Sequence, residues 1–238
     1  NAPGNDMRFY NERVEASRNF ANKVWNASRF IMMNMDENII DEPSHDLFTP
    51  ADRWILSAAN TLAKDVTDNM DKFELGIAVQ KVYDFIWDEF CDWYVEMAKF
   101  RIYHKEEAPE AANCALWVLK TVLAQGLKLL HPFMPFITEE IWQHLPHEGK
   151  SIMISEWPEY DEKLIDKELE NDMEEVLDIV VLGRACRNTA NIKNRQPIGM
   201  MYVKAPEALS DFYIDIIEDE LNVKKVEFTD DVAAFTAY

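Results

Sequence analysis

Glycine is scarce in this sequence, with only 6 in 238 residues. Gly-rich phosphate-binding loops and turn-rich all-β folds need more glycine than this, so a mostly helical chain is expected. The three cysteines, Cys91, Cys114 and Cys186, are odd in number and far apart. This usage predicts reduced thiols in a cytoplasmic protein, with no disulfide frame and no zinc site. No apolar run approaches ~18 residues, so no membrane span is expected.

Acidic residues exceed basic ones by 44 to 24, for a formal charge of -20, but two segments escape this excess. Residues 183–204 contain five bases and no acid, and residues 1–35 contain five bases and three acids. Binding of phosphate depends on the local field within about a Debye length, ~8–10 Å. These two basic segments are therefore candidates for nucleic-acid contact. An acidic module that docks a basic protein, without binding RNA, is the alternative from a different class.

An amphipathic helix is predicted over residues 14–35. At 100° per residue, one arc of this helix is apolar and consists of Phe20, Val24, Ala27, Ile31 and Met35. A separate arc without any acid consists of Arg18, Asn22, Asn26 and Arg29. Guanidinium and amide groups in such a row can donate to phosphates and base edges. An ordinary solvated helix face is the other interpretation.

Four more helices are predicted before residue 149. The second begins at Thr49, which is placed to cap it, with Pro50 at the first helical position and Asp52 at the third. The others cover residues 74–103, 108–130 and 133–145. The helix over 74–103 is rich in aromatics, namely Tyr83, Phe85, Trp87, Phe90, Trp93, Tyr94 and Phe100. Most of them, such as Tyr83, Trp87, Phe90 and Tyr94, recur at helical spacing, which indicates a core stripe rather than a row of base-stacking platforms.

The C-terminal third follows a different pattern. Helices are predicted over residues 163–191 and 208–220, and strands over 200–204 and 223–228. An irregular connection at 149–162 precedes them. We therefore expect two domains, a helical bundle over residues 3–158 and a small α/β subdomain over 159–238.

Catalytic and metal chemistry find little support in the residues. Glu140, His144 and His147 lie close in sequence, but Pro146 breaks the helix between the two histidines and no third strong ligand is near. We expect no metal site. No nucleophile and base form a defensible pair, so no catalytic residue is assigned.

Three long stretches resemble a known family. These are PGNDMRFYNERVEASRNFANKVWNASRF (3–30), ELGIAVQKVYDFIWDEFCDWYVEMAK (74–99) and LLHPFMPFITEEIWQ (129–143). They are similar to the anticodon-binding helical region of valyl-tRNA synthetases, and the resemblance covers residues 3–158. Residues 182–205 and 220–231, LGRACRNTANIKNRQPIGMMYVKA and ELNVKKVEFTDD, look more like the C-terminal portion of isoleucyl-tRNA synthetases. Valine is favoured because its matches are longer and more numerous, and isoleucine stays open.

The resemblance implies a mainly α fold, the anticodon-binding helical bundle of class I aminoacyl-tRNA synthetases with a small C-terminal α/β appendage. It implies binding of the tRNA anticodon arm, which positions tRNA for ATP-dependent aminoacylation. The His-x-Gly-His and Lys-Met-Ser-Lys-Ser type motifs of that chemistry do not occur in these 238 residues. Catalysis, with ATP and magnesium, would belong to a separate catalytic domain of the parent enzyme, and no cofactor is expected in this segment. The opening Asn1, which no initiator Met precedes, also suggests an excised domain.

The expected partners are valine tRNA, with isoleucine tRNA as the alternative, and the catalytic domain; no membrane partner is expected. Phe30, beside Arg29, is the expected stacking residue, although a core contact is the equal alternative. Arg8 resembles the arginine of the family's stem-contact motif. The residues expected to contact tRNA are Arg8, Arg18, Asn22, Asn26, Arg29, Phe30, Arg184, Arg187, Lys193 and Arg195.

Overall fold

The computed structural model describes residues 10–35, 41–204 and 209–230. The chain divides into two compact units, residues 1–165 and 166–238. The boundary between them lies seven residues beyond the one expected from sequence. Within the described ranges, no helix combines the length and apolarity that a membrane crossing requires.

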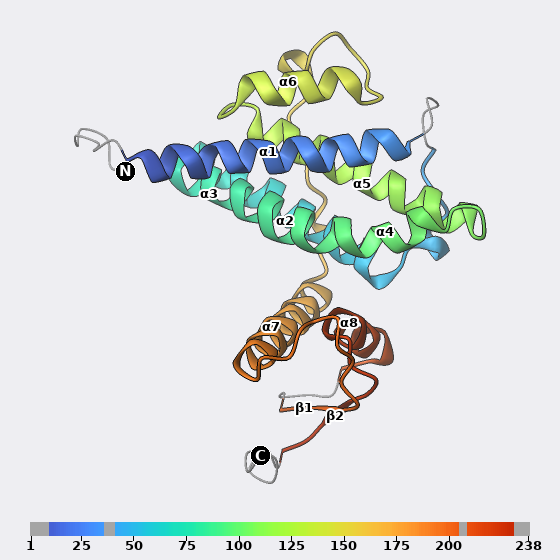
Figure 1. Ribbon diagram of the computed structural model, residues 1–238. Helices are drawn as coiled ribbons and strands as arrows, with labels where there is room; N and C mark the ends of the chain where they lie inside the picture. Colours follow the sequence, from blue (N-terminus) through green and yellow to red (C-terminus); the bar gives the residue numbers. More distant parts are fainter. Residues whose placement is uncertain (1–9, 36–40, 205–208, 231–238) are drawn as a thin grey trace. The chain divides into compact units, whose positions relative to one another are not determined.

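The first unit is a helical bundle (Figure 1). Its α-helices are α1 (Asn11–Asn34), α2 (Pro50–Asp71), α3 (Leu75–Asp84), α4 (Val95–Tyr103), α5 (Pro109–Leu130) and α6 (Pro135–His144). Three short 3-10 turns accompany them, η1 (His45–Leu47), η3 (Ile152–Ile154) and η4 (Glu162–Leu164). Helix α1 contacts α5, α6 and the run between α3 and α4, and its buried side includes Phe20, Val24 and Ile31. The predicted apolar arc is thus confirmed at its centre.

The helix predicted over residues 74–103 is not a uniform α-helix. A π-helical segment, η2 (Phe85–Tyr94), joins α3 to α4 without a break in the chain's helical path. The hydrogen bond typical of this helix type joins a backbone N–H to the carbonyl five residues earlier, as the N–H of Val95, just after the segment, does to Phe90. The sequence did not predict this change, because the α-helical period was assumed over the whole of residues 74–103.

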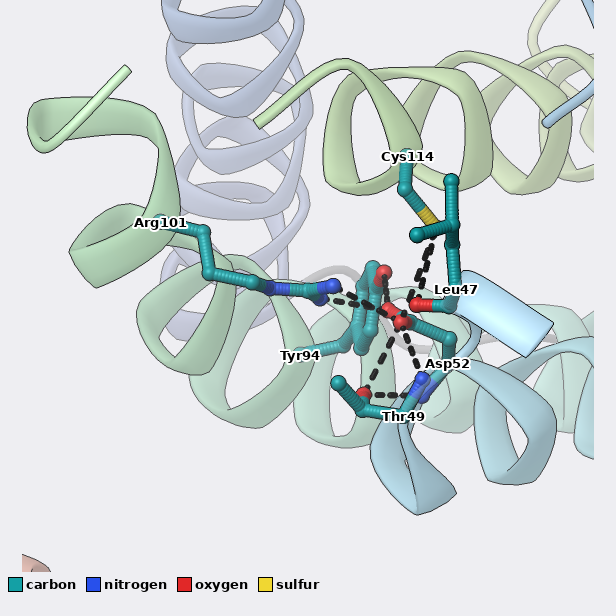
Figure 2. Close-up of polar contacts among 6 residues, drawn as sticks. All are labelled: Leu47, Thr49, Asp52, Tyr94, Arg101 and Cys114. Carbon is teal, nitrogen blue, oxygen red and sulfur yellow. Dashed lines mark hydrogen bonds and ion pairs between the residues drawn. The ribbon is translucent and has the colours of Figure 1, made fainter. Parts of the chain in front are cut away.

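The start of α2 shows why the sequence folds as it does there. The Thr49 hydroxyl accepts from the Asp52 backbone N–H at 3.2 Å, and the Asp52 carboxylate accepts from the Thr49 backbone N–H at 2.8 Å. This reciprocal pair is the predicted cap. Asp52 is also completely buried and accepts from Arg101 of α4 and from the Tyr94 hydroxyl (Figure 2). One carboxylate therefore starts α2 and ties it to α4.

The described part of the second unit, residues 166–204 and 209–230, contains two helices and a minimal sheet. Its elements are α7 (Lys167–Thr189), β1 (Met201–Val203), α8 (Asp211–Leu221) and β2 (Val226–Phe228). The strands pair in parallel, with Met201 opposite Val226, and α7 packs on α8. The expected order of helix, strand, helix and strand is confirmed, with shorter strands. Gly183 of α7 lies so close to Leu221 that an added Cβ would come within 2.3 Å of a Leu221 methyl carbon.

Candidate nucleic-acid interface

The polar row of α1 faces outward from the bundle. Arg18, Asn22, Asn26 and Arg29 are all exposed. The structure separates them into two groups, because Asn22 and Asn26 line a groove whereas Arg18 and Arg29 are not part of its lining. The amides are therefore placed to meet a bound group inside the groove. The two arginines remain available to groups outside it.

This groove, the α1 groove, lies between α1 and the η2–α4 run and has a volume of about 420 Å³. Its α1 wall carries amides and a lysine, and its opposite wall carries carboxylates and a second lysine. Lys23 bridges the walls through an ion pair of 2.7 Å with Asp92, and Lys99 pairs with Glu96 at 2.5 Å. The lining consists of Asn19, Asn22, Lys23, Asn26, Ala27, Phe30, Cys91, Asp92, Val95, Glu96 and Lys99.

The chemistry of the α1 groove suits hydrogen bonding to a flat polar ring. Amides of Asn22 and Asn26 both donate and accept, while carboxylates of Asp92 and Glu96 accept only. Nucleobase edges present the same mixture of donors and acceptors, and unstacked bases of RNA loops are read along those edges. An arrangement of amide on one wall and carboxylate on the other can therefore discriminate between bases.

An aromatic cluster marks the end of the groove near the C-terminus of α1. Phe30 is half-buried, and its ring meets that of Tyr103 edge to face, with centroids 6.3 Å apart at 85°. Tyr103 is 66% exposed, and the ammonium of Lys99 lies 5.6 Å from the centre of the Phe30 ring. The core contact that sequence left open for Phe30 is only partial. Tyr103 and Lys99 are neighbours that sequence reasoning missed, because they lie some 70 residues away.

Phe100 differs from the expectation for its helix. Four of the seven aromatics between residues 83 and 100 are buried, namely Phe85, Phe90, Trp93 and Tyr94. Tyr83 and Trp87 are half-buried and stack on Phe20. Phe100 is instead 69% exposed, with its ring 4.3 Å from that of His104. The predicted core stripe is confirmed at Phe90 and Tyr94 and in part at Tyr83 and Trp87, which are half-buried, whereas Phe100 lies outside it.

Cys91 lines the α1 groove and is itself buried. Burial raises the pKa of its thiol to about 12, so the thiol stays protonated at neutral pH. Burial and the neighbouring carboxylates of Asp84 and Asp92 also raise the pKa of Asp88. Asp88 is not part of the groove lining, whose carboxylates are those of Asp92 and Glu96.

The second basic segment contains residues in three different situations. Arg184 forms an ion pair with Glu220 at 2.5 Å. Arg187 is only 3% exposed and donates to backbone carbonyls, including that of Leu221 at 2.9 Å. Lys193 and Arg195 are exposed on the loop after α7. Sequence placed Arg187 among the RNA contacts; its burial makes it part of the framework, and we remove it from the RNA-facing set. Arg8 lies outside the described residues.

Metal ligation receives no geometric support in the described part of the chain. No group of three or more His, Cys, Asp or Glu side chains there could hold a metal ion. His144 and His147 direct their Nδ1 atoms at backbone carbonyls, those of Glu140 and Leu145, each at 2.8 Å. These contacts fit local helix-end geometry.

Comparison with protein families gives one match across both units. Residues 52–205 match the family model described as the anticodon-binding domain of tRNA ligase. This match crosses residue 158. It therefore includes parts of both the segment that resembled valyl-tRNA synthetases and the segment that resembled isoleucyl-tRNA synthetases.

Curated relatives point the same way. The valine–tRNA ligase of Clostridium acetobutylicum is 54% identical over 193 residues, which cover 81% of this chain and 22% of the relative. That of Clostridium perfringens is 50% identical over 213 residues, 89% of this chain and 24% of the relative. That of Bacillus anthracis is 46% identical over 211 residues. The chain thus spans about a quarter of the length of these relatives. A match of 213 residues exceeds the bundle segment and continues into the C-terminal one.

Among solved structures, a similar chain is the agnB2 LeuRS of Agrobacterium radiobacter K84, in its ternary complex with tRNA and LeuAMS. The TM-score is 0.47 at 19% identity, and the similarity covers 67% of this chain and 18% of the other.

Proposed function

The chain belongs to the family of anticodon-binding domains of tRNA ligases, and from this premise we propose that its α1 groove binds the anticodon loop of a tRNA. The observation that carries the proposal is the composition of the groove. Asn22 and Asn26 face carboxylates across it, and Phe30, whose ring meets that of Tyr103, is part of its lining. A helical core does not require such a surface, whereas reading of an unstacked base does.

In the proposed mode, one splayed base stacks on the exposed side of the Phe30–Tyr103 pair. Its edge enters the groove and bonds to the amides of Asn22 and Asn26. Lys99, which lies over the Phe30 ring, places positive charge beside the stacked base. Arg18 and Arg29, outside the lining, contact phosphates on either side.

Carboxylates on the wall opposite α1 contribute selectivity in this proposal. Asp92 and Glu96 accept from base N–H groups, and they disfavour a phosphate that enters in the wrong register. Their ion pairs with Lys23 and Lys99 lower the electrostatic cost of bringing RNA close. The groove therefore tolerates RNA while it rejects a misplaced backbone.

We assign valine tRNA as the preferred partner because the relatives reported above are valine–tRNA ligases. Isoleucine tRNA is the alternative that residues 182–205 suggested. The parent enzyme would use ATP with magnesium in a catalytic domain outside this segment, in the cytoplasm. The segment itself supplies binding energy that positions the tRNA for that reaction. Arg8 is proposed as a stem or interdomain contact from its motif.

Purified valine and isoleucine tRNA transcripts test the proposal, with fluorescence anisotropy as the measurement. We expect tighter binding of valine tRNA and loss of that preference when its anticodon is exchanged. Phe30→Ala should weaken binding by ~1–3 kcal/mol, the usual contribution of one base stacked on an aromatic ring. Phe30→Tyr, which keeps the ring, is the matched control. Equal binding of both tRNAs and both variants would refute the α1 groove as the reading site.

A further inference from the structure

The loop at residues 190–197, which follows α7, is fixed by a buried arginine. The Arg187 guanidinium donates to the carbonyls of Lys193 at 3.4 Å and Gln196 at 2.7 Å. The same guanidinium also donates to the carbonyls of Leu221 and Asn222, at the C-terminal end of α8. The loop is therefore tied on both sides of Arg195 to the framework of the second unit.

Two further contacts hold the same loop. The Asn222 side-chain amide donates to the Asn194 carbonyl at 3.1 Å, and the Gln196 N–H closes a turn onto Lys193 at 2.9 Å. Asn222 itself adopts a left-handed conformation, with φ of 47°, which asparagine tolerates better than most residues. Lys193 and Arg195 therefore project from a loop whose backbone is held by hydrogen bonds, and both are exposed.

An apolar cavity, the α7 cavity, lies beside this loop. Gly183 and Cys186 of α7, with Ala190 just after its end, supply one part of the wall. Met201 and Tyr202 of β1, with Met200 just before the strand, supply another part, and the remaining lining is Arg187, Ile192, Ile198, Leu221 and Val223. Tyr202 is 40% exposed and Met200 39%, so an aromatic ring and a thioether border the cavity mouth. The volume is about 280 Å³, below the ~300–1,000 Å³ typical of sites for drug-sized ligands.

We propose that the α7 cavity receives a single unstacked base of the bound tRNA, while Lys193 and Arg195 contact the phosphates beside that base. This inference rests on the function proposed above and adds a second contact site in the second unit. The cavity has the two components that single-stranded RNA requires, a stacking surface and adjacent positive charge.

Charge selects RNA over an apolar peptide as the occupant. Residues 183–204 supply most of the cavity wall and the whole loop, and they contain five bases and no acid in a chain of formal charge -20. Arg187 is buried and Arg184 pairs with Glu220, so Lys193, Arg195 and Lys204 supply most of the exposed positive charge. An apolar peptide would gain nothing from that concentration of positive charge. A polyanion with flat apolar rings matches both the cavity and its rim.

The native cysteines supply a direct probe of the α7 cavity. Cys186 lines the cavity and is exposed, whereas Cys91 and Cys114 are buried. Burial also raises the thiol pKa of Cys91 to about 12 and that of Cys114 to about 11, which suppresses their thiolate fraction. Alkylation of the unmodified chain by iodoacetamide should therefore report on Cys186.

The experiment measures the rate of Cys186 alkylation with and without saturating valine tRNA, by mass spectrometry. We expect tRNA to slow alkylation about tenfold or more, consistent with a base held against Tyr202. Tyr202→Ala should abolish most of this protection, and Tyr202→Phe should retain it. Replacing both Lys193 and Arg195 with Ala should flatten the salt dependence of tRNA binding by roughly two phosphate contacts. Lys150→Ala removes an exposed charge elsewhere and should leave that dependence unchanged.

Each outcome separates this inference from the function on which it rests. If tRNA binds with the expected Phe30 dependence but Cys186 reacts at its free rate, the α7 cavity is not an RNA site and the α1 groove stands. If no tRNA binds, both proposals fail. If Cys186 becomes protected as the protein concentration rises without RNA, the cavity is a contact between copies of the chain, which also overturns the inference.

Discussion

The carboxylate of Asp52 accepts two hydrogen bonds from the guanidinium of Arg101, at 2.8 and 2.5 Å, although 49 residues separate them (Figure 2). Asp52 is completely buried, and the Arg101 side chain is 16% exposed. Arg101 lies on α4 two residues before Tyr103, the exposed aromatic whose ring meets that of Phe30. The pair therefore fixes the part of α4 that presents this ring.

Removing the arginine should destabilise the chain strongly. Arg101→Met leaves a buried carboxylate without its counter-ion, at a cost of about 3–5 kcal/mol in the free energy of unfolding. Urea unfolding followed by circular dichroism measures this cost. Arg53→Met, which removes an exposed arginine from α2, should change stability by less than about 0.5 kcal/mol. A second change, Asp52→Asn, should recover part of the loss. Equal stability of the two single arginine variants would contradict this account.

Stability should also fall in acid through Asp52. Burial alone would raise the pKa of this carboxyl, but the hydrogen bonds and charge of Arg101, with Tyr94 and Thr49, outweigh burial and lower it. A depressed folded-state pKa gives stability that is present above the unfolded value, near 3.8, and is lost as pH falls through the folded one. Urea midpoints measured from about pH 7 to about pH 3 should decline less for Asp52→Asn than for the native chain. A parallel decline would exclude Asp52 as a contributor.

Two mid-helix glycines should respond in opposite directions to the same substitution. In Gly183→Ala the new Cβ would meet Leu221 at 2.3 Å, and Leu221 is buried, so we expect a loss of ~1–3 kcal/mol. In Gly126→Ala the nearest atoms, of Ile86, lie at 3.6 Å, an ordinary contact. That variant should be unchanged or gain up to ~1 kcal/mol from helix propensity. Thermal or urea unfolding of both variants shows whether the packing collision or the helix propensity of alanine decides the change in stability.

Arg29 should contribute to tRNA affinity through phosphate rather than base recognition. Arg29→Ala should weaken binding of all tRNAs alike and reduce the slope of log affinity against log salt by about one contact. Anisotropy titrations at several salt concentrations measure this slope. Asn26→Ala, in the groove lining, should instead reduce the preference for the matching anticodon and leave the slope unchanged. If Arg29→Ala altered the preference and not the slope, the two roles would be exchanged.

Local features of the fold were predictable from sequence. The cap at Thr49 and Asp52 and the apolar arc of α1 depend on neighbours within a few positions, and both are confirmed. The amide row of α1 was visible for the same reason. The alternative of an acidic protein-docking module loses its basis, because the family match assigns the chain to the anticodon-binding domains.

Long-range pairings were not predictable in the same way. Nothing near Asp52 in sequence indicates that its carboxylate meets Arg101, and nothing near Phe30 indicates Tyr103. Arg187 was predicted to contact RNA together with Lys193 and Arg195, because the sequence does not show which bases of a basic segment are buried. Each of these residues depends on contacts made only after helices pack.

The π-helical segment η2 affects which positions of the run from α3 to α4 face the core. Buried residues recur there every fourth position, at Val82, Ile86, Phe90, Tyr94, Ala98 and Ile102. In a regular α-helix, at 100° per residue, such a row would drift by about 40° at each step and by about 200° over its length. The wider turns of η2 offset part of that drift, so a period of four can stay in the core from α3 to α4. Phe100 does not belong to this four-residue series, and its ring lies at the surface.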